Sequence, residues 1–206
     1  MLLLFSKKTG PPEPSIFWQA TATAYAATAT SVNVTWPAVF SASSYDVARS
    51  VDGTSYTIIA SVAAPPFTDN GVTPDTSYLY KVRANVAATS TTSSYTAPDL
   101  ATTVIFTDPA LSGVTIKAVH ITQLRTAVNA VLALAGGMPA ATFTDPAITP
   151  GTTRAKAAHI SELRSNLNTA RSSLSLPAQS YTDPTLVVNS TVIKAQHILD
   201  LRNGVQ

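Results

Sequence analysis

The first half of the chain alternates apolar and polar residues with the two-residue period of a half-buried β-strand. The alternation is clear at residues 32–36 and 45–50, and it runs longest through 78–84. The pair Asp52-Gly53 falls between two such runs and is a typical hairpin turn. Short alternating runs separated by turn residues predict a sandwich of about seven antiparallel strands.

Three segments of this half resemble a fibronectin type III domain, and the resemblance covers residues 18–105. They are the Val-Thr-Trp that ends at Trp36, the strand that starts at Tyr45, and the Pro-x-Thr-x-Tyr-x-Tyr segment around Tyr78. The resemblance implies an all-β immunoglobulin-like sandwich with Trp36 packed between its sheets. It also implies that Tyr78 is the tyrosine-corner residue, whose hydroxyl bonds to nearby backbone. Both roles are structural, so the resemblance implies no activity.

The second half contains three copies of one unit, spaced 37 and 38 residues apart. Each copy starts with an aromatic residue and Thr-Asp-Pro, and continues into Lys-Ala-x-His-Ile-x-x-Leu-Arg. This predicts a small all-α domain of three helical repeats at residues 106–142, 143–180 and 181–206. The repeat resembles tandem units of large secreted or surface proteins of bacteria. The charged and imidazole side chains that we single out in every copy are Asp108, Asp145 and Asp183, His120, His159 and His197, and Arg125, Arg164 and Arg202.

Apolar residues recur in each copy at helical spacing, which predicts one helix per unit. In the first copy they run from Ile121 and Leu124 to Ala135. The Asp-Pro pair predicts a further short helical turn at the start of each unit. The third copy ends at Gln206, roughly two helical turns early, and is either a short helix that caps the stack or an open end that another subunit completes. Candidate N-caps of the three helices are Thr115, Thr153 and Thr191.

The three recurring His invite a metal site, but each belongs to a different helix. Stacked helices lie about 8–10 Å apart, whereas zinc–nitrogen bonds are about 2.0–2.1 Å long. Three equivalent His in a linear stack therefore cannot easily share one ion. We expect each His to bond to the Thr-Asp-Pro turn of its own unit, and each recurring Asp to cap a turn or pair with a recurring Arg. We predict no metal and no cofactor.

The composition excludes several classes of function. Charged residues make up 12% of the chain and the net charge is +2, too weak an imbalance for a nucleic-acid binder. The absence of Cys excludes disulfides and zinc–thiolate sites. No apolar run approaches the ~20 residues of a membrane span. The sequence also lacks a glycine-rich phosphate loop and a nucleophile elbow, so we expect no enzyme.

We expect residues 1–17 to form an extended N-terminal arm. The arm begins with a short apolar segment, Leu2, Leu3, Leu4 and Phe5, which is followed by a Pro-rich spacer. Ala, Thr and Ser supply 83 of the 206 residues, so the surface carries little charge. Together with the unfinished third copy, these features favour a structural subunit of an extracellular bacterial surface fibre. Such a subunit assembles head to tail with other copies of itself, and the apolar segment is the part that docks.

The alternative hypothesis is a non-catalytic binding or spacer module of a secreted adhesin or polysaccharide-active protein. Its partner is then a polysaccharide or another surface protein. Trp18 and Tyr95 are the aromatic residues with most freedom to contact sugar. Both hypotheses place the chain outside the cell or at its surface.

Overall fold

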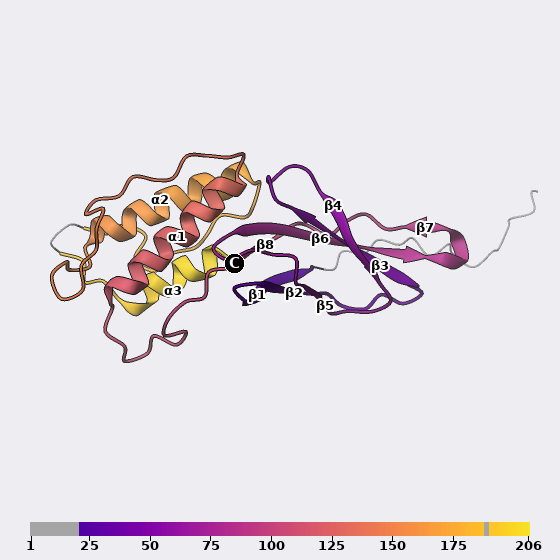
Figure 1. Cartoon of the computed structure of the whole chain (residues 1–206), viewed down its shortest axis with the longest axis horizontal. Coiled ribbons are helices and arrows are strands. Elements are labelled where there is room, and N and C mark those ends of the chain that lie inside the picture. Colours follow the sequence, from indigo (N-terminus) through magenta and orange to yellow (C-terminus); the bar gives the residue numbers. More distant parts are fainter. Residues whose placement is uncertain (1–20, 188–189) are drawn as a thin grey trace, which may run out of the picture.

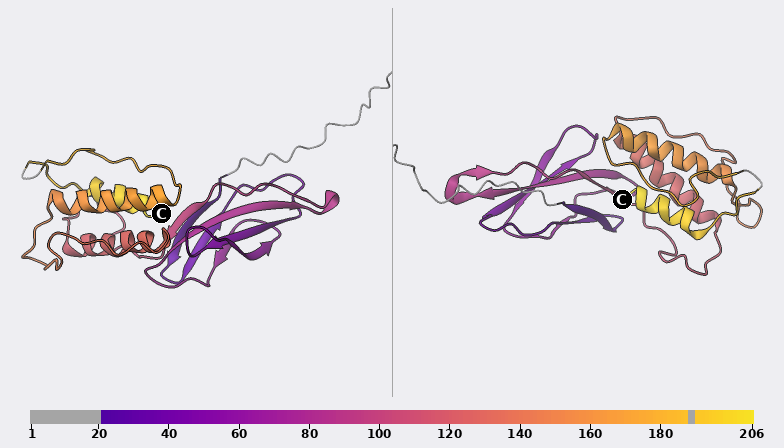
Figure 2. Two further views of the ribbon diagram at one scale, coloured as in Figure 1. Left: turned by 90° about the horizontal axis from the view of Figure 1, so that it is seen from above. Right: turned by 180° about the vertical axis from the view of Figure 1, so that it is seen from behind.

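The computed structural model describes residues 21–187 and 190–206. A β-sandwich comes first along the chain, and three helices gather at one end of it (Figures 1 and 2). One sheet has the strand order β1-β2-β5, and the other has β4-β3-β6, with β7 and β8 both paired to β6. The strands are β1 (Thr23–Thr28), β2 (Ser31–Thr35), β3 (Ser44–Ser50), β4 (Thr57–Val62), β5 (Phe67–Asp69), β6 (Ser77–Val86), β7 (Thr91–Thr92) and β8 (Asp99–Thr102).

The alternating side chains of the strands build the core between the two sheets. Val32 and Val34 of β2 face Val47 of β3 and neighbouring residues of β6 in one buried cluster. Trp36 is only 4% exposed, and its ring centroid lies 5.4 Å from that of Tyr45. The two-sheet sandwich is confirmed, and Trp36 lies in its core.

Tyr78 forms the tyrosine corner that the resemblance implies. Its hydroxyl accepts a hydrogen bond from the backbone N–H of Thr73 at 3.0 Å, five residues upstream. The hydroxyl also lies 3.1 Å from that of Thr73. This contact ties the start of β6 to the loop before it.

Three helices follow the sandwich: α1 (Ala118–Leu134), α2 (Ala157–Ser173) and α3 (Ala195–Gly204). The predicted Thr N-caps are wrong, because each helix begins after an extended Lys, as at Lys117 with φ −101° and ψ 161°. In the second unit Thr153 lies too far upstream to cap. Its hydroxyl instead accepts a hydrogen bond from the N–H of Thr149 and closes a loop.

The helical turn predicted at each Asp-Pro pair is absent from the described residues. Asp108, Asp145 and Asp183 have φ values of 51°, 50° and 48°, which is the left-handed region. A residue before proline is disfavoured in the right-handed helical region, whereas Asp tolerates the left-handed one. The backbone therefore turns sharply at each Asp instead of starting a helix.

A second apolar cluster, separate from the core between the sheets, joins the helices to the sandwich. Leu79 of β6 and Leu100 of β8 belong to the same buried cluster as Leu132 and Leu134 of α1. Val104, just after the last strand, is 4% exposed and also joins this cluster. No helix in the described part of the chain is both long enough and apolar enough to span a bilayer.

Candidate functional site

Each helix starts beside a cluster of three side chains, which we call the Asp–Lys–His clusters. They are Asp108, Lys117 and His120; Asp145, Lys156 and His159; and Asp183, Lys194 and His197. In each, the His Nε2 lies 3.0–3.1 Å from a carboxylate oxygen of the Asp. The His Nδ1 accepts a hydrogen bond from the Lys backbone N–H at 3.2–3.3 Å. These contacts hold each left-handed Asp turn against its own helix.

The two hydrogen bonds of each imidazole determine its tautomer and its role. An Nδ1 that accepts a backbone N–H leaves the proton on Nε2, which donates to the Asp carboxylate. The three His side chains are fully buried. Both ring nitrogens are therefore occupied inside the protein. Among residues 21–187 and 190–206, no three His, Asp or Glu side chains gather in a way that could hold a metal ion.

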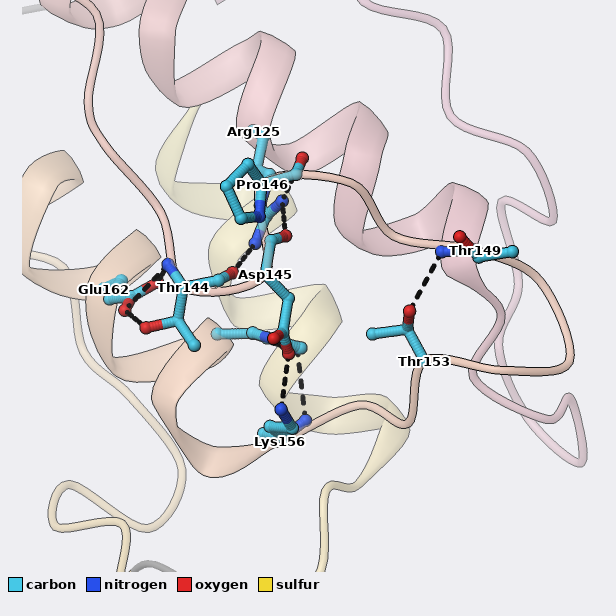
Figure 3. A network of polar contacts seen from close by, with 9 residues as sticks. Arg125, Thr144, Asp145, Pro146, Thr149, Thr153, Lys156 and Glu162 are labelled. Carbon is cyan, nitrogen blue, oxygen red and sulfur yellow. Dashed lines mark hydrogen bonds and ion pairs between the residues drawn. The ribbon is translucent and has the colours of Figure 1, made fainter.

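A second set of contacts joins each unit to the next. The Arg125 guanidinium donates to the carbonyl oxygens of Thr144 at 2.6 Å, Asp145 at 2.9 Å and Pro146 at 3.2 Å (Figure 3). The same guanidinium lies over the Phe143 ring, 4.6 Å from its centroid. Arg164 contacts the third unit in the same way, through the carbonyls of residues 182 and 183. We call each such arrangement an Arg clamp.

The expected pairing of recurring Asp and Arg side chains is wrong. The Arg side chains donate to backbone carbonyls. Arg125 and Arg164 each belong to the unit before the one whose turn they hold. The Asp carboxylates accept from Lys and His instead.

The third Arg clamp closes the helical part of the chain on itself. Arg202 donates to the carbonyls of Thr107 and Asp108 at 2.8 Å each, although 94–95 residues separate them in sequence. Its guanidinium lies 4.7 Å from the Phe106 ring centroid. The last unit therefore contacts the first, and the three helices do not form a linear stack. The interpretation of the third copy as an open end that another subunit completes is wrong, because its partner is in the same chain.

One recurring contact escaped the sequence comparison because its residue type changes. The residue two positions before each clamp Arg accepts the N–H of the Thr in its own Thr-Asp-Pro turn. It is Gln123 in the first unit, Glu162 in the second and Asp200 in the third. Three different acceptors perform one role, and only the shared presence of a side-chain oxygen marks it in the sequence.

The Asp–Lys–His clusters predict a loss of stability in acid. Hydrogen bonds from Lys and then His lower the pKa of each cluster carboxyl below its ordinary value of 3.8. A carboxyl whose pKa is lower in the folded state stabilises the fold above its unfolded pKa and stops doing so as the pH falls through its folded pKa. We therefore expect the helical circular dichroism signal to hold from pH 7 to pH 5 and to weaken progressively below about pH 4.

The variant Asp145→Asn tests whether these carboxyls are responsible. It should be less stable than the wild type at pH 7 and lose less on acidification, because one titrating group is missing. Asp75→Asn, at a side chain outside the clusters, is the control. An acid response of Asp145→Asn equal to that of the wild type would contradict this assignment.

The outer face of the β4-β3-β6 sheet carries stacked cations and tyrosines. The Lys81 ammonium lies 3.7 Å from the Tyr56 ring centroid and 4.5 Å from that of Tyr95. Arg83 lies 5.0 Å from the Tyr95 centroid and forms an ion pair with Asp46. Burial lowers the pKa of Lys81. Tyr95, expected to be a freer aromatic, is half-buried beneath these cations.

Several residues named from the sequence lie outside the described part of the chain. They are Trp18 and the proposed docking segment, Leu2, Leu3, Leu4 and Phe5.

Three concavities that share lining residues form a row along the helices and the adjoining part of the sandwich, and the sequence did not predict them. The first, lined by Phe143, Asn129 and Thr126, has a volume of about 390 Å³ and is named the Phe143 pocket. The second, of about 280 Å³, shares Thr126 with the first. The third, of about 360 Å³, shares Ile105 with the second and is lined by Phe106, after which it is named the Phe106 pocket.

No protein-family model matches the chain, and no curated protein matches it. Among solved structures, an Fn3-like protein from Clostridium thermocellum is 30% identical over 40% of this chain and 88% of its own, with a TM-score of 0.37. The sixth fibronectin type III domain of human fibronectin type III domain containing protein 3 is 17% identical over 51% and 96%, with a TM-score of 0.38. Pectate lyase Pel3 from Pectobacterium carotovorum is 16% identical over 40% and 26%, with a TM-score of 0.34.

These TM-scores are below 0.5, so the assignment depends on the strands themselves. The order β1-β2-β5 against β4-β3-β6, together with the Tyr78 corner, decides it. The sandwich is fibronectin type III-like. In this fibronectin type III-like sandwich the outer face of β6 and β8, through Leu79 and Leu100, is where the helices attach.

Proposed function

We propose that the chain is a non-catalytic binding module of an extracellular bacterial protein and that it contacts a polysaccharide. One observation carries the proposal. The polar side chains that recur in the three units are occupied by contacts within the chain, while the row of concavities stays open to solvent. A module of this kind offers a surface for recognition and no group for reaction.

The closed arrangement of the three units supports this function. The Arg202 clamp joins the last unit to the first, and we infer that the three units form one ring-closed helical repeat domain. The apolar cluster that joins the helices to Leu79 and Leu100 of the sandwich then makes that domain an extension of the sandwich. Such a unit suits a spacer that also presents a binding surface.

The buried His side chains argue against catalysis as the main role. Each Asp–His pair resembles part of a hydrolytic triad, in which an Asp orients a His that activates a nucleophile. Here the imidazole is fully buried and its Nδ1 accepts a backbone N–H. Neither nitrogen is left to take a proton from a nucleophile.

The fibre hypothesis now has fewer observations in its favour. It was motivated by the apolar arm, the low surface charge and the unfinished third copy. Arg202 and the fully buried Ile198 and Leu201 of α3 find partners within the chain, so the third motive is gone. The arm lies outside the described residues, and only an experiment on the intact chain can test it.

The experiment compares the full chain with a truncated chain that begins at Ser15. Both are sedimented with insoluble polysaccharides and viewed by electron microscopy at rising concentration. We expect saturable sedimentation of both chains and monomers throughout. Ordered fibres from the full chain alone would instead establish the arm-driven fibre subunit. Monomers of both chains that sediment with no polysaccharide would overturn the binding function.

A further inference from the structure

The row of concavities follows from the way in which the Arg clamps join the units. Two of the clamps, those of Arg125 and Arg202, have a hollow beside the aromatic ring, between a helix and the turn that the clamp holds. The Phe143 pocket lies beside the Arg125 clamp and the Phe106 pocket beside the Arg202 clamp. Ala26 and Ala27 of β1 line the Phe106 pocket too, so the sandwich contributes part of its wall.

The remaining clamp differs in its aromatic residue. At the Arg164 clamp the aromatic residue is Tyr181, whose hydroxyl donates to the side-chain oxygen of Asn168 at 2.8 Å. Asn168 follows its clamp Arg by four residues, as Asn129 follows Arg125. With Phe in place of Tyr, this hydrogen bond cannot form. The two Phe junctions line pockets of about 390 and 360 Å³, which fall in the size range of small-molecule sites.

The charges around the row favour an uncharged ligand. Arg125 and Arg202 are the cations among its lining residues, and both guanidinium groups already donate to backbone carbonyls. Asp75 is the carboxylate among them, and it lies in the middle concavity. Both Arg residues are nearly buried, at 7% and 5% exposed, and their terminal donors point to those carbonyls, so neither presents an open ion-pairing edge to an anionic chain. The exposed Asp75 carboxylate repels such a chain.

Neutral hydrogen-bonding groups are left over along the row. Asn129 uses its side-chain oxygen to accept the N–H of Ala141, which leaves its amide nitrogen to donate. The Thr126 hydroxyl donates to the Thr122 carbonyl, and its oxygen can still accept. Beside these groups stand apolar surfaces from Phe, Pro and Ala side chains. A sugar ring matches this combination, because it presents hydroxyl groups around its rim and C–H groups on its faces.

We propose that the row binds one neutral oligosaccharide chain, with one sugar ring in the Phe143 pocket, another in the Phe106 pocket and the connecting residues over Thr126 and Ile105. The proposal rests on the binding function proposed above and names its ligand class and its site. The Tyr181 junction lies outside the row and takes no part.

The test uses the full chain and titration calorimetry with hexasaccharides of glucose, mannose and xylose, and with a galacturonic acid hexamer as the charged probe. The variants Phe143→Tyr and Phe106→Tyr add to each pocket the hydroxyl that Tyr181 carries at the third junction, where it binds Asn168. Tyr181→Phe is the matched control, because it makes the reverse change outside the row. We expect at least one neutral hexasaccharide to bind with a stoichiometry of one hexasaccharide per protein molecule. The affinity for the charged hexamer should be at least tenfold lower.

Each Phe→Tyr variant should weaken binding by about tenfold and the pair together by about a hundredfold, while Tyr181→Phe leaves it unchanged. Equal thermal midpoints for all variants would show that folding is intact. Neutral binding that the Phe→Tyr variants leave intact would overturn this site but keep the binding function. Tighter binding of the charged hexamer, or of a Gly-Ser hexapeptide, would overturn the ligand class. No saturable binding of any probe would overturn both the site and the function.

Discussion

Replacing Arg202 by Ala should destabilise the protein by about 3–5 kcal/mol. Arg202 is 5% exposed, and its guanidinium donates to two backbone carbonyls at 2.8 Å each. A hydrogen bond to a charged group contributes about 1.5–3 kcal/mol, and its loss leaves a carbonyl without that donor. Removing the cation from the Phe106 ring adds to the loss. The free energy of unfolding, measured by urea denaturation, gives the result.

The size of this effect distinguishes a closed ring from an open stack. If the ring is closed in solution, Arg202→Ala and Arg125→Ala should cost similar amounts, because each breaks one junction of the same kind. Arg202→Lys should recover little, since an ammonium cannot present the two-pronged donor geometry. Arg154 is exposed, and Arg154→Ala should change stability by less than about 0.5 kcal/mol. An Arg202→Ala cost as small as that of Arg154→Ala would mean that the last unit does not contact the first.

The turn that Arg202 clamps lies far upstream of it in the sequence. Arg125 and Arg164 each clamp the next Thr-Asp-Pro turn along the chain, whereas Arg202 clamps the turn of the first unit. Local spacing predicts helices well, but contacts across 94–95 residues leave no periodic trace.

Local sequence patterns predict the structure correctly where the conformation of a segment is set by its own residues. The alternation in 32–36 and the hairpin at Asp52-Gly53 both predict what forms, because side-chain direction and turn geometry are set locally. The Thr N-caps failed because a His at the third helical position captures the backbone N–H that starts the helix. The concavities escaped prediction because their walls come from β1, α1, α3 and two turns.

One glycine lies in tight contact between the sandwich and the helices. Gly53 lies in the β3–β4 hairpin with φ +77°. The Asp52 carboxylate accepts the N–H groups of Thr54 and Ser55, which holds the pKa of that carboxyl well below its usual range and fixes the turn. A Cβ added at Gly53 would lie 2.5 Å from both the carbonyl oxygen of Leu134 and a methyl of Leu174. The hairpin therefore touches the ends of α1 and α2 with no room for a side chain.

Gly53→Ala should destabilise the protein by about 2–4 kcal/mol, as strain at positive φ adds to overpacking against a backbone atom that cannot move aside. Gly113→Ala is the matched control, because Gly113 has φ +71° and no atom within 4 Å of an added Cβ. It should cost about 1 kcal/mol, from the backbone strain alone. The difference between the two losses of stability measures the contact between the helices and the sandwich. Limited proteolysis near residues 102–106 should become faster only in Gly53→Ala. Equal costs for the two variants would mean that helices and sandwich are not packed together in solution, and the β1 wall of the Phe106 pocket would then be absent as well.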